Sequence, residues 1–134
     1  MATYQSELVA NGPVYNEVGP KIRKATYSIT AAIAGGTNVI EMIPVYAGET
    51  VVDVTLMSTD LDTNGSPAID LNVGDAADVD RFITTSTVGQ AGGVARLNDN
   101  VGHVYTADDT LDINIETAAA TGAAGTLTLV ATLI

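Results

Sequence analysis

Residues 60–65 carry oxygen-bearing side chains at a spacing that could bind a metal ion. They read Asp-Leu-Asp-Thr-Asn-Gly, so Asp60, Asp62 and Asn64 alternate as in the first half of an EF-hand calcium loop. The second half of the pattern fails, because the twelfth position is Leu71, where such loops need a bidentate glutamate. Asp and Asn are also common turn residues. We expect a plain turn, and keep Asp60, Asp62 and Asn64 as candidate Ca²⁺ ligands in a chain that otherwise needs no cofactor.

A second group of carboxylates lies at Asp75, Asp78 and Asp80. Residues 76–84 have the apolar spacing of a helix, and Asp75 suits its N-cap while Asp78 suits the positive end of its dipole. We therefore expect one short helix at 76–84. Alternatively, carboxylates gathered from several loops could hold Ca²⁺ or Mg²⁺ at a subunit interface.

Catalytic chemistry has little support in the sequence. His103 is the only histidine, and the Gly-x-Ser-x-Gly turn that would supply a nucleophile for a Ser-His-Asp relay is absent. The glycine-rich segments at 35–36, 89–93 and 122–125 are not followed by Lys-Ser or Lys-Thr, so no phosphate-binding loop is present. Nothing selects two carboxylates as a glycosidase pair. We expect no catalytic residues and no enzyme activity.

The composition limits the partners of the chain. Its 134 residues carry a formal net charge of −11, which argues against nucleic acid and anionic membranes as partners. There is no cysteine, so disulfides and thiolate metal sites are excluded. The first residues lack the features of a signal peptide, and no stretch reaches the roughly 18 apolar residues of a membrane span. We expect a protein made in the cytoplasm that binds other proteins.

Residues 1–24 differ in charge balance from the rest of the chain. Three of the five basic residues, Lys21, Arg23 and Lys24, lie at the end of this segment, and Gly12-Pro13 and Gly19-Pro20 interrupt it. A tail whose charge differs from that of its domain often contacts a partner. The prediction is an extended N-terminal arm over 1–24, with those three basic side chains as its partner-binding residues. The alternative is a first edge strand and a disordered terminus.

Residues 25–134 have the periodicity of β-strands. Around Ile113, for example, apolar and polar residues alternate strictly from Leu111 to Glu116. Such alternation predicts strands at 25–33, 39–46, 50–58, 67–73, 101–106, 110–117 and 126–133. This number of short strands predicts an all-β fold, either a barrel or, as we prefer, an antiparallel jelly-roll-like β-sandwich. Because aromatic residues are only 4% of the chain, we expect contacts with further copies or a larger assembly to add buried surface.

Two segments of this domain resemble a known class of virion proteins. Residues 66–83 read SPAIDLNVGDAADVDRFI, and residues 105–133 read YTADDTLDINIETAAATGAAGTLTLVATL. Together with the Pro-Val-Tyr-Ala-Gly-Glu strand and turn at 44–49, they are similar to small proteins encoded in the head-gene clusters of tailed bacteriophages. These are head decoration, capsid cement or minor virion proteins. The resemblance covers residues 39–134.

The resemblance implies a β-sandwich that binds the major capsid protein on the outer capsid surface, often as a homotrimer at a three-fold or quasi-three-fold position. It carries over no catalytic residues. It implies a location in the virion after synthesis in the host cytoplasm, and the predicted arm would add a strand to the sheet edge of a neighbour. The alternatives are another virion component, such as a head-fibre, tail or baseplate protein, or a calcium- or carbohydrate-binding adhesion module.

Overall fold

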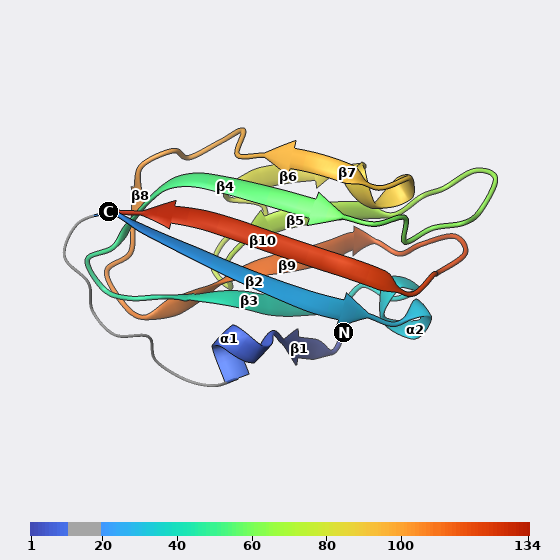
Figure 1. Cartoon of the computed structure of the whole chain (residues 1–134), viewed down its shortest axis with the longest axis horizontal. Helices are drawn as coiled ribbons and strands as arrows, with labels where there is room; N and C mark the ends of the chain where they lie inside the picture. The colour runs from blue at the N-terminus through green and yellow to red at the C-terminus, as the bar shows by residue number, and fades with distance from the viewer. Residues whose placement is uncertain (11–19) are drawn as a thin grey trace.

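The alternating strands stack into two β-sheets (Figure 1). The computed structural model describes residues 1–10 and 20–134. One sheet has the order β1-β3-β9-β5-β6, and the other has the order β2-β10-β4-β7 with β8 also paired to β4. The strands are β1 (Thr3–Gln5), β2 (Lys21–Ile29), β3 (Val39–Val45), β4 (Thr50–Ser58), β5 (Asp70–Gly74), β6 (Ile83–Ser86), β7 (Gly93–Arg96), β8 (His103–Val104), β9 (Asp109–Thr117) and β10 (Gly125–Leu133). Three single-turn helices accompany them: α1 (Glu7–Ala10), α2 (Ala31–Ala34) and the 3-10 turn η1 (Val88–Gln90).

The strand order is that of a jelly roll. The rows β2-β10-β4-β7 and β3-β9-β5-β6 are antiparallel throughout, and the chain crosses repeatedly from one sheet to the other. The parallel strand β1 extends the second row beyond β3. The prediction of an all-β, jelly-roll-like sandwich is confirmed.

The inner faces of the two sheets form one apolar core. Leu111, Ile113 and Ile115 of β9 and Leu127 and Leu129 of β10 are all buried, as strict alternation predicts. Burying an aliphatic side chain of this size contributes about 1.5–3 kcal/mol to folding. The core therefore fixes which face of each strand points inward, and hence the register of both sheets.

The predicted helix at 76–84 is not formed. The carboxylate of Asp75 accepts hydrogen bonds from the backbone N–H groups of Ala77 and Asp78, as an N-cap would, but the chain then turns back instead of continuing as a helix. The backbone N–H of Phe82 donates to the carbonyl of Val73, and Phe82 is buried in the core. Core packing of Phe82 and the pairing of β6 with β5 thus override the local helical pattern.

The predicted strand at 25–33 is shifted toward the N-terminus. Strand β2 begins at Lys21 and ends at Ile29, and Thr30 then caps the short helix α2 by accepting a hydrogen bond from the N–H of Ile33. Ile33 is buried from the helix rather than from the strand. An apolar residue can reach the core from either element, so alternation alone did not locate the end of the strand.

The N-terminal residues lie on the sandwich itself. Strand β1 pairs in parallel with β3, with Thr3 opposite Val39, and the N–H of Ser6 donates to the carbonyl of Glu41 at 2.9 Å. The predicted boundary at residue 24 falls inside β2, because Lys21 is already paired with Leu133 of β10. Gly12, Pro13 and Gly19, which were predicted to interrupt the arm, lie outside the described residues.

Candidate functional site

Asp62 holds two distant loops together. Its carboxylate accepts hydrogen bonds from the backbone N–H groups of Asn64, Ala68, Ile69, Ala120 and Thr121, at 2.7 to 3.2 Å. Burial alone would raise the pKa of this carboxyl, but the N–H donors outweigh it and hold the pKa well below its usual range. The side chain is buried and ionised, and it orders the loop after β4 against the loop before β10.

The other two candidate calcium ligands serve the same loop. Asp60 accepts from the N–H of Asp62, and Asn64 accepts from the N–H of Ser66 while donating to the hydroxyl of Thr121. A carboxylate has about four lone-pair positions, and five donors already occupy those of Asp62. The geometry fits the turn interpretation better than a calcium site. Within residues 1–10 and 20–134, no group of three or more His, Asp or Glu side chains is arranged to hold a metal ion.

Two of the three predicted partner-binding residues are committed to an internal ion pair. Arg23 donates to both carboxylate oxygens of Glu49 at 2.6 Å, and Lys21 approaches the same carboxylate at 3.1 Å. The guanidinium of Arg23 also donates to the carbonyl of Pro44 and lies 5.1 Å from the centre of the Tyr46 ring. Lys24, in contrast, is exposed on the outer side of β2.

Glu49 anchors this cluster at the turn between β3 and β4. Burial would raise its pKa, but hydrogen bonds from Arg23, from the N–H of Tyr46 and from Lys21 lower it to about 2. Arg23 and Glu49 are each only 6% exposed, so the pair joins the β2 edge of one sheet to the β3–β4 turn. The predicted roles of Lys21 and Arg23 in partner binding stay untested, but both cations already contact the single carboxylate of Glu49 within the chain.

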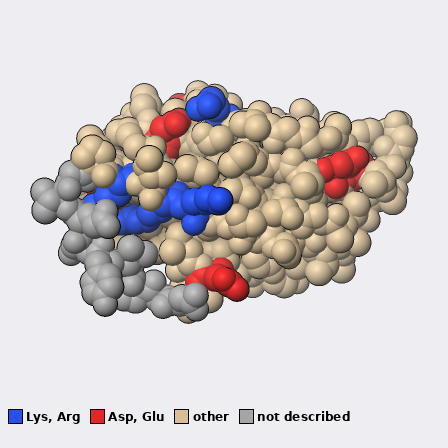
Figure 2. All heavy atoms as spheres, viewed as in Figure 1, with Lys and Arg blue, Asp and Glu red and all other residues tan. Residues whose placement is uncertain are grey.

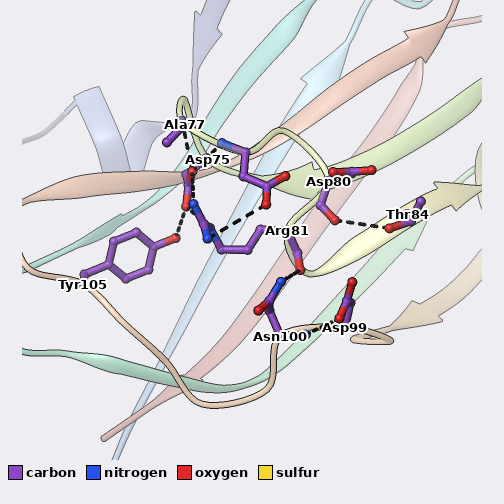
Figure 3. Close-up of polar contacts among 9 residues, drawn as sticks. Asp75, Ala77, Asp80, Arg81, Thr84, Asp99, Asn100 and Tyr105 are labelled. Carbon is purple, nitrogen blue, oxygen red and sulfur yellow. Dashed lines mark hydrogen bonds and ion pairs between the residues drawn. The ribbon is translucent and has the colours of Figure 1, made fainter.

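A third polar cluster surrounds Asp75 (Figure 3). The carboxylate accepts from Arg81 at 2.7 Å and from the hydroxyl of Tyr105 at 2.7 Å, in addition to the two backbone N–H groups of its own turn. Burial opposes ionisation of Asp75, but Arg81 and Tyr105 outweigh it and lower its pKa. Burial and then the bond to Asp75 raise the pKa of Tyr105 far above its usual value.

This cluster lacks a group suited to proton transfer near neutral pH. The pKa of Asp75 is lowered and the pKa of Tyr105 is raised. A general acid or base, in contrast, works best with a pKa near the operating pH. His103 borders the same open depression of about 350 Å³, and its ring packs edge-on against Tyr105 at 4.7 Å and Phe82 at 6.1 Å. The arrangement is that of a histidine packed against two aromatic rings beside a structural ion pair.

Asp112 is a buried carboxyl with a raised pKa. It lies on the outer side of β9 and is 6% exposed, and burial raises its pKa to about 7 although the hydroxyl of Thr110 donates to it. The negative charge of Glu41 contributes to this rise in pKa. A depression of about 240 Å³ is bordered by Asp112, Glu41 and Asp75, with no basic side chain in its lining. Neighbouring carboxylates therefore favour the protonated form of Asp112.

Sequence reasoning missed the parts played by Glu49 and Tyr105. Their partners are 26 and 30 residues away along the chain, so no local spacing marks them. One signal was available for the first cluster. Arg23 shares the inward face of β2 with Ala25 and Ile29, and a cation on a buried face requires a carboxylate partner.

The sequence matches no protein-family model and no curated protein. Solved structures do match. A chain in the capsid asymmetric unit of cyanophage Pam1 superposes with a TM-score of 0.75 at 29% identity, covering 92% of this chain and 94% of that one. A chain in the capsid of Ralstonia phage GP4 superposes with a TM-score of 0.79 at 26% identity, covering 98% of this chain and 97% of that one.

A third neighbour shows the fold alone. It is a chain in the acid-stable capsid of Helicobacter pylori bacteriophage KHP30, with a TM-score of 0.64 at 12% identity over 86% of this chain and 87% of that one. The two neighbours above 25% identity support a relation to phage capsid proteins and a structural role in the virion.

Proposed function

We propose that the chain is a decoration or cement protein, which binds the outer surface of a phage capsid and stabilises contacts between major capsid subunits. The observation that carries the proposal is similarity over nearly the whole length to chains of two phage capsids. Because each superposition covers at least 94% of the neighbour as well, those chains are also small β-sandwiches of about this size.

The fold is consistent with an added subunit. The sandwich completes its own apolar core, and every fully buried side-chain N or O atom of residues 1–10 and 20–134 has a hydrogen-bond partner within the chain, so contact with a shell must use outer faces, edges and loops. Each such contact can be weak, because symmetry repeats it and a homotrimer would bind through three copies at once. The arm predicted at the N-terminus supports this role less than expected, since β1 already pairs with β3 of its own chain.

The proposal is tested by the copy number of the chain in purified virions. A decoration protein is expected in numbers comparable to the major capsid protein, as measured by quantitative mass spectrometry. A few copies per particle would instead identify a head-fibre, tail or baseplate component. Virions that lack the chain should also release their genome at a lower temperature than complete virions, and an unchanged release temperature would contradict a cementing role.

A further inference from the structure

We infer that the outer face of the sheet β2-β10-β4-β7 is the surface that docks on the capsid. We call it the docking face and represent it by Ile22, Lys24, Val94, Arg96, Thr128 and Val130. The partner is a protein surface of uncharged groups with carboxylates opposite Lys24 and Arg96. The inference rests on the proposed function, because it names the side of the molecule by which that function is performed.

The first observation is the uncharged character of this face. Strand β10 presents Thr126, Thr128, Val130 and Thr132 outward, in alternation with the buried Leu127, Leu129, Ala131 and Leu133. Figure 2 views the molecule from this side and shows a broad area of uncharged side chains, with basic groups over β2. The outward residues of β2, β4 and β7 add only Lys24, Arg96 and Asp53 as charges. The face therefore has a formal charge of about +1 in a chain of net charge −11.

The second observation is that apolar side chains lie open on this face. Ile22 is 74% exposed and Val94 is 61% exposed. Threonine is common on the outer face of a sheet because of its high β-propensity. An exposed isoleucine or valine, in contrast, contributes little to folding because it buries little apolar surface. Covering them with a partner would remove apolar surface from water at almost no cost in desolvated charge.

The third observation is the contrast with the opposite sheet. Its outer side carries Glu41, Asp70 and Glu116 on β3, β5 and β9, and Asp78 and Asp80 lie in the adjoining loop. Among the described residues of that side, Arg81 is the cation, and it is paired with Asp75. Copies crowded on a particle repel each other least when this acidic side faces solvent. With the acidic side facing solvent, the docking face is the sheet face that contacts the capsid.

Lys24 is the charge on the docking face best placed to recognise a partner. It is exposed, and no carboxylate of residues 1–10 or 20–134 lies within 4.0 Å of its amine, whereas Arg96 is 3.9 Å from Asp53. A carboxylate on the partner would therefore meet a cation that has no ion-pair partner among the described residues. Contacts of this kind set orientation and association rate more than affinity.

The test uses two variants of the docking face and a matched control. Val94→Glu adds a carboxylate to the docking face, and Lys24→Glu reverses the charge of the lysine there. The control, Val79→Glu, adds a carboxylate at an exposed valine beside the acidic side. Capsids assembled without the chain are mixed with each purified protein and sedimented. We expect Val94→Glu and Lys24→Glu to weaken binding at least tenfold, with Val79→Glu binding like the wild type. A thermal melt of each variant checks that it is folded.

Each other outcome overturns the inference in a recognisable way. Wild-type binding by both docking-face variants would show that another surface docks, and the proposed function would stand. Failure of the wild-type protein to bind capsids would remove the proposed function and the inference together. If light scattering without capsids shows that only self-association is lost, the face is a contact between copies and not the capsid-binding surface.

Discussion

At the scale of single residues, buried carboxylates in this chain have opposite ionisation behaviour because their neighbours differ. Asp62 is surrounded by backbone N–H groups and Glu49 by two cations, so both pKa values are lowered. Asp112 is equally buried, but it has one hydroxyl donor and the neighbouring carboxylate of Glu41. The first two therefore stabilise the fold as anions, whereas Asp112 is held most easily as a neutral acid.

The sign of the Asp112 effect follows from the direction of its shift. The folded pKa is raised from 3.8 to about 7, so between these values the folded protein retains a proton that the unfolded chain releases. The unfolded state then binds fewer protons, and stability falls as pH rises through this window. Glu49 has the reverse dependence, since its pKa is lowered from 4.5 to about 2 and its contribution is lost as pH falls across that range.

The variant Asp112→Asn should therefore be more stable than the wild type above pH 7. Asparagine keeps an acceptor for Thr110 and removes the unfavourable ionisation, so we expect the free energy of unfolding at pH 8 to rise by on the order of 2–3 kcal/mol. The difference in the free energy of unfolding between the variant and the wild type should shrink toward pH 4. Urea denaturation of both proteins between pH 4 and pH 8 measures this difference at each pH. Glu116→Gln, an exposed carboxylate of the same strand, is the control, and equal pH profiles for the two variants would contradict the account.

At the scale of elements, the sequence predicts best those strands that the core alone defines. Strands β3, β4, β9 and β10 lie within a residue of their predicted bounds, because each is a run of seven to nine residues with apolar side chains for the core and turn residues at its ends. Three short edge or end strands, β1, β6 and β7, were not predicted. They have three or four residues each, too few to show a periodicity, and β1 and β7 form by pairing with strands distant in sequence.

In the polar clusters, likewise, contacts between residues close in sequence could be predicted and contacts between distant segments could not. The loop of Asp60, Asp62 and Asn64 could be predicted as a turn, because Asx side chains bond to N–H groups two residues ahead. That Asp62 also binds Ala120 and Thr121 depends on the packing of the two loops, which local sequence does not encode. Partner-binding residues were predicted from charge alone, and charge does not distinguish the buried Arg23 from the exposed Lys24.

The loop from β5 to β6 can be tested at Gly74. A Cβ atom at this position would overlap the backbone carbonyl of Asp78 and the backbone of Val79, so the loop packs against the bare glycine. We expect Gly74→Ala to destabilise the protein by about 2–4 kcal/mol, measured by urea denaturation. Gly65→Ala is the matched control, because a Cβ there meets nothing within 4 Å. If Gly74→Ala were as stable as the control, the loop would not be anchored as described.

At the scale of the whole molecule, the charges of the described strands are divided unevenly between the two outer sheet faces, with acidic side chains on β3, β5 and β9 and a formal charge of about +1 on the docking face. The acidic side discourages contacts between copies, while the docking face, which is the side seen in Figure 2, has little charge to oppose them. A protein built this way can crowd on a particle with one side bound and the other hydrated. Self-association before binding should strengthen with ionic strength, because salt screens the repulsion between the acidic copies.

The oligomeric state in solution provides the last prediction. We expect size exclusion with light scattering to give a mass three times the 13.7 kDa of the chain, because a trimer would match a three-fold capsid position with the docking face of every copy on one side. The trimer should be unaffected by millimolar Ca²⁺, since Asp62 is already saturated by backbone donors. A monomer would mean that copies assemble only on the shell. A change of mass with Ca²⁺ would show that a carboxylate loop binds the ion, and would require a different account of residues 60–64.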